Sequence, residues 1–364
     1  MTEPIRVGIV GVGWGSVVQT PAFRMVPGYE VVAICSRRSE SVAKAGENLG
    51  IEDTSTDWES FVRRDDLDLI SVCTPVNLHA EQAIAAIESG KHVLCEKPQA
   101  LSAADAGRML HAAESADVAH AVCFEGRYER DRLPVWDLVT AGYLGRPLVA
   151  QAHTVADYWH PSRGLQSEWM YRVAEGGGYL MGMASHDIDF LCCLFGEPDA
   201  VCADVRSSVP RRPRPDGSEL EVDADDTSVV LMRMRSGVLV TISVSAVGLL
   251  HSRRELDLLG SEGTIVIEGT IQGGEPDVRA ARVGDDTPHA VPLSERMPRS
   301  GAKLPQRRAA GAIRSLALML EDWLPAFRGA PAPGVPTLAD GWRVQRVIDA
   351  ARRSSDGEGW VPLA

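Results

Sequence analysis

The stretch over residues 71–98 constrains the fold of this chain more than any other. It alternates strand-like and helix-like patterns in this order: an apolar run over 67–73, Thr74-Pro75, a helical pattern over 78–89, an apolar run over 92–95, and Glu96-Lys97-Pro98. Asn77 is expected to cap the helix and Gly90 to end it. Two parallel strands joined in this way end at the same edge of a sheet, where α/β proteins bind ligands. We therefore expect Lys97 at a ligand-binding edge, in a turn that the following proline fixes.

A glycine-rich turn follows the first apolar run and opens a helical pattern. Its sequence is Gly11-Val12-Gly13-Trp14-Gly15-Ser16, a G-x-G-x-x-S variant of the dinucleotide fingerprint. Gly11 permits the tight turn, Gly13 lets a pyrophosphate approach the backbone, and Ser16 stands where a third glycine normally allows close helix–strand packing. The start of the helix then favours the anionic pyrophosphate. The turn predicts a dinucleotide-binding domain at the start of the chain.

Further markers follow along the chain. They are Thr74-Pro75 with His79, the block Gly90-Lys91-His92-Val93, Glu96-Lys97-Pro98, the triplet Gly176-Gly177-Gly178, His186, Asp189 and a late Asp340-Gly341. In these markers, and in the glycine-rich turn before them, the chain resembles the Gfo/Idh/MocA family of oxidoreductases, named for glucose–fructose oxidoreductase and inositol dehydrogenase. The resemblance spans nearly the whole chain and implies a nicotinamide-dependent enzyme.

The first ~125 residues alternate between strand and helix patterns, as parallel α/β domains do. Strands are predicted near 5–10, 30–35, 68–73, 92–95 and 118–123, and helices near 15–26, 39–49, 57–64, 78–89 and 102–116. The alternation predicts a doubly wound, parallel Rossmann sheet, so residues 1–125 are assigned to an NAD(P)-binding domain. Pro21 is expected to bend or restart the first helix.

Beyond this domain the pattern changes to short β-rich segments separated by turns. They lie at 147–155, 199–206, 227–234, 238–247, 254–260 and 263–268, after a helix over 129–142. These segments predict an open, mostly antiparallel sheet, and residues 126–364 are assigned to an α+β domain for substrate binding and oligomerisation. The regions 207–224 and 270–310 are predicted loops, and helices are expected near 312–328 and 337–353. The resemblance implies that the last helix packs on the first domain and that the sheet supports a homodimer or homotetramer.

Charge and hydropathy exclude several classes of partner. The net charge of −13 over 364 residues argues against nucleic acid and anionic membranes, and the basic run over 211–214 is interpreted as a solvated loop. No run reaches the ~20 apolar residues of a membrane span, and the N-terminus enters a strand too soon for a signal peptide.

The cysteines lack C-x-x-C spacing and indicate buried thiols in a reducing cytoplasm; they are Cys35, Cys73, Cys95, Cys123, Cys192, Cys193 and Cys202. No clustered ligand pattern predicts a metal site.

The end of the second predicted strand bears on the choice of nicotinamide cofactor. An NAD site usually places Asp or Glu there to hold both ribose hydroxyls, but this chain has Ser36, Arg37 and Arg38, and Glu40 lies already in the next helix. Serine and arginine can bind a 2′-phosphate through charge-assisted hydrogen bonds, so we expect NADP rather than NAD. The alternative is that the arginines are solvated and the adenine stacks on one of them.

Lys97 and His186 are the expected catalytic residues. Glu96 can neutralise and orient Lys97, and the resemblance implies that this lysine contacts the reacting hydroxyl. His186 matches the family's substrate-side histidine, and Asp189 lies three residues on, on the same helical face. The sugar- and inositol-oxidising members usually carry Asp four residues before this histidine, where this chain has Gly182. The glycine leaves space for a larger or differently held substrate.

The remaining candidates follow from position. The cofactor is expected to contact Gly11, Gly13, Trp14, Gly15, Ser16, Ser36, Arg37, Arg38, Thr74, Pro75, Asn77, His79, Glu96, Lys97 and Pro98. The substrate is expected to contact Lys97, Arg127, Tyr158, Trp159, Trp169, His186 and Asp189. Two alternatives stay open here: His79 can pack inward from its helix, and the aromatic residues near 158–169 can form a plain hydrophobic lid.

These features together predict an NAD(P)-dependent oxidoreductase acting on a secondary alcohol or ketone of a sugar, polyol or related cyclic substrate. One rival keeps the fold but recycles a tightly bound NAD internally and cleaves glycosides. A second rival is a cofactor-binding regulatory protein without catalysis, which the replacement of the usual aspartate by Gly182 keeps open.

Overall fold

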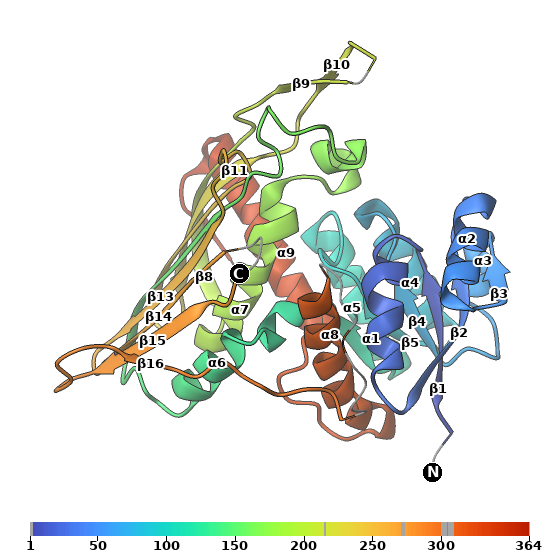
Figure 1. Cartoon of the computed structure of the whole chain (residues 1–364), viewed down its shortest axis with the longest axis horizontal. Coiled ribbons are helices and arrows are strands. Elements are labelled where there is room, and N and C mark those ends of the chain that lie inside the picture. The colour runs from blue at the N-terminus through green and yellow to red at the C-terminus, as the bar shows by residue number, and fades with distance from the viewer. Residues whose placement is uncertain (1–2, 215, 271–273, 300–303, 305–308, 364) are drawn as a thin grey trace. The chain divides into compact units, whose positions relative to one another are not determined.

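The computed structural model describes residues 3–214, 216–270, 274–299, 304 and 309–363. The chain forms two compact units (Figure 1). The first unit comprises Met1–Glu129 and Glu295–Trp342, and the second comprises Arg130–Ser294 and Arg343–Ala364. The first unit therefore includes a segment that follows the second unit's sheet in the sequence.

The described part of the first unit is built on a six-stranded sheet in the order β3-β2-β1-β4-β5-β6. Its strands are β1 (Ile5–Val10), β2 (Tyr29–Cys35), β3 (Asp53–Ser55), β4 (Leu69–Val72), β5 (His92–Cys95) and β6 (His120–Val122). Every neighbouring pair is parallel. The predicted doubly wound Rossmann sheet is confirmed, and its strand order reverses between β1 and β4, the switch point at which such sheets bind ligands.

Local chemistry explains some of the helix ends in this unit. They are α1 (Thr20–Arg24), α2 (Ser39–Leu49), α3 (Trp58–Phe61), α4 (His79–Glu88), α5 (Ala103–Ala116) and α8 (Ala310–Trp323). Ser102 caps α5 by accepting the Asp105 amide, and Gly50 ends α2 in the left-handed conformation. Pro21 is the second residue of α1, and a π-helical turn, η1 (Gly15–Gln19), runs directly into that helix. α4 packs between α3 and α5, and α1 packs against α8.

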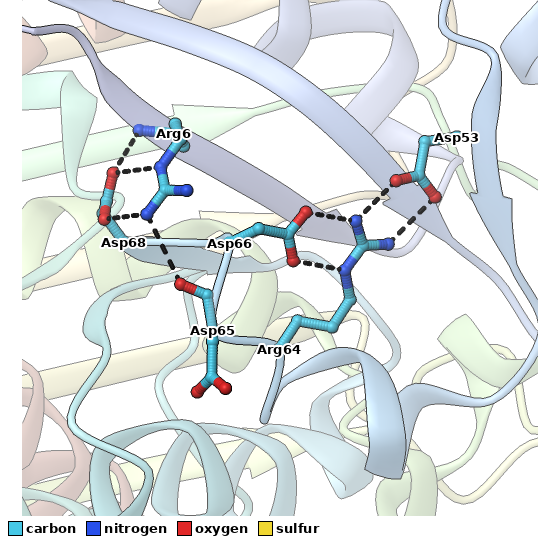
Figure 2. Close-up of polar contacts among 6 residues, drawn as sticks. All are labelled: Arg6, Asp53, Arg64, Asp65, Asp66 and Asp68. Atoms are coloured by element: carbon cyan, nitrogen blue, oxygen red, sulfur yellow. Dashed lines mark hydrogen bonds and ion pairs between the residues drawn. The ribbon is translucent and has the colours of Figure 1, made fainter.

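Two arginines tie the starts of β1 and β4 to the edge strand β3 (Figure 2). Arg6 donates from Nε and Nη2 to Asp68 at 3.0 and 2.8 Å, and Arg64 donates to both Asp53 and Asp66. Arg64 lowers the pKa of Asp66 to about 2 through these hydrogen bonds. Such half-exposed pairs each contribute little stability.

Among the described residues of the second unit, nine strands form one sheet in the order β16-β15-β14-β13-β7-β12-β11-β8-β17. The strands are β7 (Pro147–Val155), β8 (Pro198–Arg206), β11 (Thr227–Met234), β12 (Leu239–Ser245), β13 (Arg253–Gly260), β14 (Gly263–Gly269), β15 (Asp277–Arg282), β16 (His289–Ala290) and β17 (Val361–Pro362). β7 and β12 are parallel and the other pairs are antiparallel. The predicted mostly antiparallel sheet is confirmed.

The prediction of a plain loop over 207–224 was wrong. The strands β9 (Arg211–Pro213) and β10 (Glu219–Glu221) pair as an antiparallel hairpin. Arg212 is buried rather than solvated, because its guanidinium lies over the Tyr171 ring, 5.0 Å from the centroid. Its Nη2 lies 3.9 Å from Asp226. In the other predicted loop, 270–310, β15 and β16 form, and residues 271–273, 300–303 and 305–308 lie outside the described residues.

The main helices of the second unit lie beside its sheet. They are α6 (Arg132–Thr140) and α7 (Ser185–Phe195), and α9 (Leu338–Arg353) begins in the first unit and ends in the second. α7 packs against β7 and β12 and against α6 (Figure 1). Across the described part of the chain, no helix has both the length and the apolar character needed to cross a bilayer. All seven cysteines fall within the described residues and none is in a disulfide.

Candidate active site

The glycine-rich turn lies between the ends of β1 and β4. The Gly11 amide donates to the Cys35 carbonyl at 2.8 Å, and Gly11 has a φ of +107°. A Cβ on Gly11 would lie 2.1 Å from the Cys73 carbonyl oxygen, so only glycine fits. A Cβ on Gly13 would meet no atom within 4 Å. The Gly13 backbone is therefore open to a pyrophosphate, as the fingerprint predicts.

The close helix–strand contact falls on a different residue from the one expected. Ser16 was expected to take the place of the packing glycine, but Gly15 is the buried residue that approaches β1. A Cβ on Gly15 would lie 2.9 Å from Ile9 Cγ2. The π-helical turn that begins at Gly15 explains the difference, because its extra residue per turn changes which side chains face the sheet.

Lys97 follows β5 at the ligand-binding edge of the parallel sheet, and its side chain is half-buried. The Glu96 carboxylate beside it accepts from Gln19 Nε2 at 2.9 Å and from the Lys97 backbone amide at 3.1 Å. Ser71 Oγ donates to Gln19 Oε1 at 2.7 Å, which fixes the amide orientation. Gln19 and Ser71 are buried functional neighbours that the sequence analysis missed, since nothing in a lone glutamine or serine signals such a contact.

Glu125 is a second carboxyl group at this edge, half-buried as a residue but with its Oε2 fully buried. It opens a 3₁₀ turn, η3 (Glu125–Tyr128), and is the third residue after β6. Burial, and next the Glu96 carboxylate, raise the pKa of Glu125 to about 8, although Lys97 acts in the opposite direction. Burial also raises the pKa of Glu96, against the influence of Lys97 and the Gln19 hydrogen bond. A raised pKa beside a candidate catalytic lysine is typical of functional sites.

This raised pKa predicts a pH-dependent loss of stability. Above the ordinary pKa of 4.5, the unfolded chain releases the Glu125 proton while the folded protein keeps it up to about pH 8. Folding therefore becomes less favourable across this interval, by about 1.4 kcal/mol for each pH unit. Glu125→Gln removes the effect, so its melting temperature should rise relative to wild type between pH 5 and pH 8. The exposed Glu88→Gln should show no such trend, and a Glu125→Gln difference that is constant with pH would contradict the prediction.

His79 packs inward at the Thr74-Pro75 turn, whereas Asn77 beside it is exposed. His79 is 1% exposed, and its Nδ1 and Nε2 lie 3.0 and 2.8 Å from the carbonyl oxygens of Pro98 and Thr74. Burial lowers the pKa of His79. These contacts favour the inward-packing alternative. Asn77 does not cap the helix as expected, because it lies inside a 3₁₀ turn, η2 (Val76–Leu78), and α4 begins at His79.

In the second unit, His186 stands near the start of α7 and is half-buried, while Asp189 is 1% exposed. Arg132, which the sequence analysis missed, anchors this end of the helix. It donates to Asp187 at 2.5 Å and to the His186 carbonyl at 3.2 Å, and its guanidinium lies over the Phe190 ring. Arg132 therefore fixes the backbone that carries His186.

The glycine triplet and Gly182 precede α7 through a π-helical turn, η6 (Leu180–Ala184). Asp225 accepts the Leu180 amide at 2.7 Å, and a Cβ on Gly178 would lie 2.3 Å from its carboxylate. Gly178 is thus required by close packing. A Cβ on Gly182 would meet no atom within 4 Å, so the space left by the missing aspartate is open.

The candidate substrate residues differ in exposure. Trp159 is buried and its ring lies 4.8 Å from that of Tyr171, whereas Tyr158 and Trp169 are half-buried. Trp159 therefore packs as a core residue. Arg127 is also buried and forms an ion pair with Asp340 at 3.0 Å, at the start of α9. Its guanidinium already binds protein groups, and a substrate contact by Arg127 stays a prediction.

Comparison with known proteins assigns both parts of the chain to one group. Residues 5–124 match the oxidoreductase family with an NAD-binding Rossmann fold, and residues 134–266 match the GFO/IDH/MocA C-terminal domain. The chain belongs to the Gfo/Idh/MocA family of oxidoreductases. It is accordingly an enzyme of the dehydrogenase and reductase type, with an NAD-binding Rossmann domain.

Several members of the family are similar to this chain over most of their length. The levoglucosan dehydrogenase of Pseudarthrobacter phenanthrenivorans is 27% identical, covering 99% of this chain and 98% of the relative. A solved structure of levoglucosan dehydrogenase in complex with NADH has a TM-score of 0.86 at 25% identity and covers 100% of both chains. The myo-inositol 2-dehydrogenase of Thermotoga maritima is 28% identical over 72% of this chain and 74% of its own.

Proposed function

We propose that this protein transfers hydride between a nicotinamide cofactor and a secondary alcohol or ketone of a sugar or polyol. The observation that carries the proposal is the edge of the Rossmann sheet, where the open Gly13 backbone and Lys97 follow strands of one parallel sheet. The names of the similar proteins, levoglucosan dehydrogenase and myo-inositol 2-dehydrogenase, support a carbohydrate-like substrate.

The chain's own residues supply the polar chemistry in this proposal. A nicotinamide cofactor, when bound, accepts or donates the hydride. Lys97 and His186 hold the substrate oxygen and handle its proton, with Asp189 on the same helix as His186. The Gly11–Ser16 turn fits a dinucleotide because Gly13 is open and a helical turn, whose N-terminus favours an anion, begins at Gly15.

A spectrophotometric screen tests this function. Purified protein would be mixed with NAD or NADP and levoglucosan, myo-inositol, scyllo-inositol or a glucoside, and with NADH or NADPH and 1,5-anhydro-D-fructose or other keto sugars. The expected result is a change in the absorbance of the reduced nicotinamide with at least one substrate. Tight cofactor binding with product formation but no net absorbance change would favour internal recycling, and binding without any product would contradict an oxidoreductase.

The finer cofactor assignment proposed is NADP. Arg37 and Arg38 at the end of β2 are exposed, and Ser36 beside them is half-buried with its amide donating to Ser55 at 3.0 Å. A relative named scyllo-inositol 2-dehydrogenase (NADP(+)), from Bacillus subtilis, is 28% identical over 63% of this chain, so NADP use occurs among similar proteins.

The double variant Arg37→Ala/Arg38→Ala tests this assignment. Losing a charge-assisted hydrogen bond costs about 1.5–3 kcal/mol, so the Kd for NADPH should rise at least about tenfold while the Kd for NADH changes little. Binding is measured by fluorescence titration, with Arg108→Ala on the exposed face of α5 as the control. Equal changes for both cofactors would point to adenine stacking instead of phosphate recognition.

The remaining proposals concern assembly and location. One side of the second sheet carries exposed apolar side chains, among them Val229 on β11 and Leu239 on β12, at 44% and 42% exposure. We infer that this face meets a second copy in a homodimer or homotetramer, because exposed apolar sheet surface marks interaction sites. The enzyme is proposed to act in the cytoplasm, where its free thiols stay reduced. Sedimentation at several concentrations would measure the assembly, and a monomer would exclude it.

A further inference from the structure

Glu125 has no part in cofactor or substrate binding as proposed above, yet it is half-buried, with Oε2 fully buried, at the same sheet edge as Lys97. β6 pairs with β5, and the Cys123 amide donates to the Cys95 carbonyl at 2.8 Å, so the chain segments after these two strands start side by side. Glu96 and Lys97 are the first two residues after β5, and Glu125 is the third residue after β6. Both Glu96 and Lys97 act electrostatically on Glu125.

The two carboxyl groups differ in their hydrogen bonds. Glu96 accepts from the Gln19 amide and from the Lys97 backbone, and donors of this kind stabilise the ionised form. Oε2 of Glu125 is buried and has no hydrogen-bond partner within the described part of the chain. If the two acids hold one proton between them, that proton lies on Glu125. The hydrogen-bond donors around Glu96 stabilise its ionised carboxylate, and Oε2 of Glu125 lacks such donors.

Among the groups that act electrostatically on Glu125, Lys97 is the basic one. Glu96 and Glu129 are acids that oppose ionisation of Glu125, and the Cys123 thiol nearby has a pKa raised well above its usual value, so it stays protonated. Lys97 is the cation of the cluster. A buried carboxyl oxygen without a hydrogen-bond partner lowers the free energy of unfolding. Proteins usually keep a destabilising group of this kind where it serves function.

We propose that Glu125 takes up and returns the substrate's hydroxyl proton through Lys97. This inference rests on the proposed hydride-transfer function. During oxidation the substrate C–H bond breaks as hydride leaves for nicotinamide C4, and the O–H bond breaks as the carbonyl forms. The hydroxyl proton goes to Nζ of Lys97 while one ammonium proton of Lys97 moves to the Glu125 carboxylate. Lys97 ends unchanged, and Glu125 ends protonated and releases its proton to water; reduction reverses each transfer.

This scheme predicts opposite pH requirements for the two directions. Oxidation needs ionised Glu125, so its single-turnover rate should rise with pH to a plateau with a midpoint near 8. Reduction needs protonated Glu125 and should fall through the same midpoint. Positioned proton acceptors contribute about 10²–10⁴-fold to rate, so Glu125→Gln should slow oxidation at the plateau about 100-fold and remove the midpoint. Glu125→Asp should keep a midpoint and recover part of the rate.

The experiment uses stopped-flow single turnovers of the full-length protein with the cofactor and substrate that respond in the screen, and the exposed Glu88→Gln as control. Cofactor Kd should be unchanged in Glu125→Gln. In parallel, infrared difference spectra between wild type and Glu125→Gln, without cofactor, report whether the carboxyl is protonated at pH 6 and ionised at pH 10. An unchanged midpoint and rate in Glu125→Gln, or a carboxyl already ionised at pH 6, would overturn the proton role. Absence of hydride transfer in wild type with every substrate would instead overturn the proposed function.

Discussion

Replacing Lys97 with alanine is expected to lower the rate of hydride transfer about 10³-fold while the protein keeps its fold and its cofactor affinity. The physical reason is that the lysine ammonium lies at the carboxyl edge of the parallel sheet, where it can hold the reacting oxygen and move its proton. Its backbone amide, which binds Glu96 at 3.1 Å, is kept in the variant, so the Glu96–Gln19 contact should persist.

Three measurements separate this effect from general damage. Single-turnover rates report the chemical step, fluorescence titration reports NADPH and NADH binding, and thermal unfolding reports the fold. Lys44→Ala, on the exposed side of α2, is the matched control and should behave as wild type. Lys97→Arg keeps the charge but carries a planar guanidinium that is not deprotonated in proteins, so it should remain slow. Wild-type turnover in Lys97→Ala would remove this lysine from the chemistry.

The regular elements of the fold could be predicted from the sequence because their periodicity is strong. The predicted bounds match, or nearly match, those of β1, α2, β7 and β11. The apolar runs and alternating patterns in these segments allow one arrangement in which their apolar side chains are buried. β3 was missed because Asp53-Thr54-Ser55 is a polar three-residue edge strand. The β9–β10 hairpin was missed because a proline- and charge-rich sequence is typical of a loop, while Arg212 is buried there against Tyr171.

Only part of the candidate site could be predicted from the sequence. The glycine-rich turn and Lys97 could be predicted, because the spacing of nearby residues indicates them. The buried partners Gln19 and Ser71 and the anchoring residue Arg132 do not, because their contacts join residues 52 to 77 positions apart. The π-helical turns at Gly15–Gln19 and Leu180–Ala184 also escape prediction, and the first of them explains why the close contact falls on Gly15 and not on Ser16.

Replacing Gly11 with alanine is expected to destabilise the first unit severely and to abolish cofactor binding with it. A Cβ at this position would lie 2.1 Å from the Cys73 carbonyl oxygen and 2.5 Å from its carbon, and the φ of +107° disfavours any L side chain. The backbone cannot move away easily, since the Gly11 amide is bonded to Cys35 and the Cys73 amide to Val10. The expected loss in the free energy of unfolding is more than about 4 kcal/mol.

Gly13→Ala is the matched comparison within the same turn, because a Cβ there meets no protein atom within 4 Å and the φ is not positive. This variant should therefore keep the wild-type melting temperature but lose most of its affinity for NADPH and NADH, since the new methyl occupies the path of the pyrophosphate. Urea unfolding and fluorescence titration of the two variants give the contrast directly. If Gly13→Ala bound cofactor as wild type does, the pyrophosphate would have to lie elsewhere; if Gly11→Ala unfolded as wild type does, the turn would be less constrained than its contacts with Cys73 indicate.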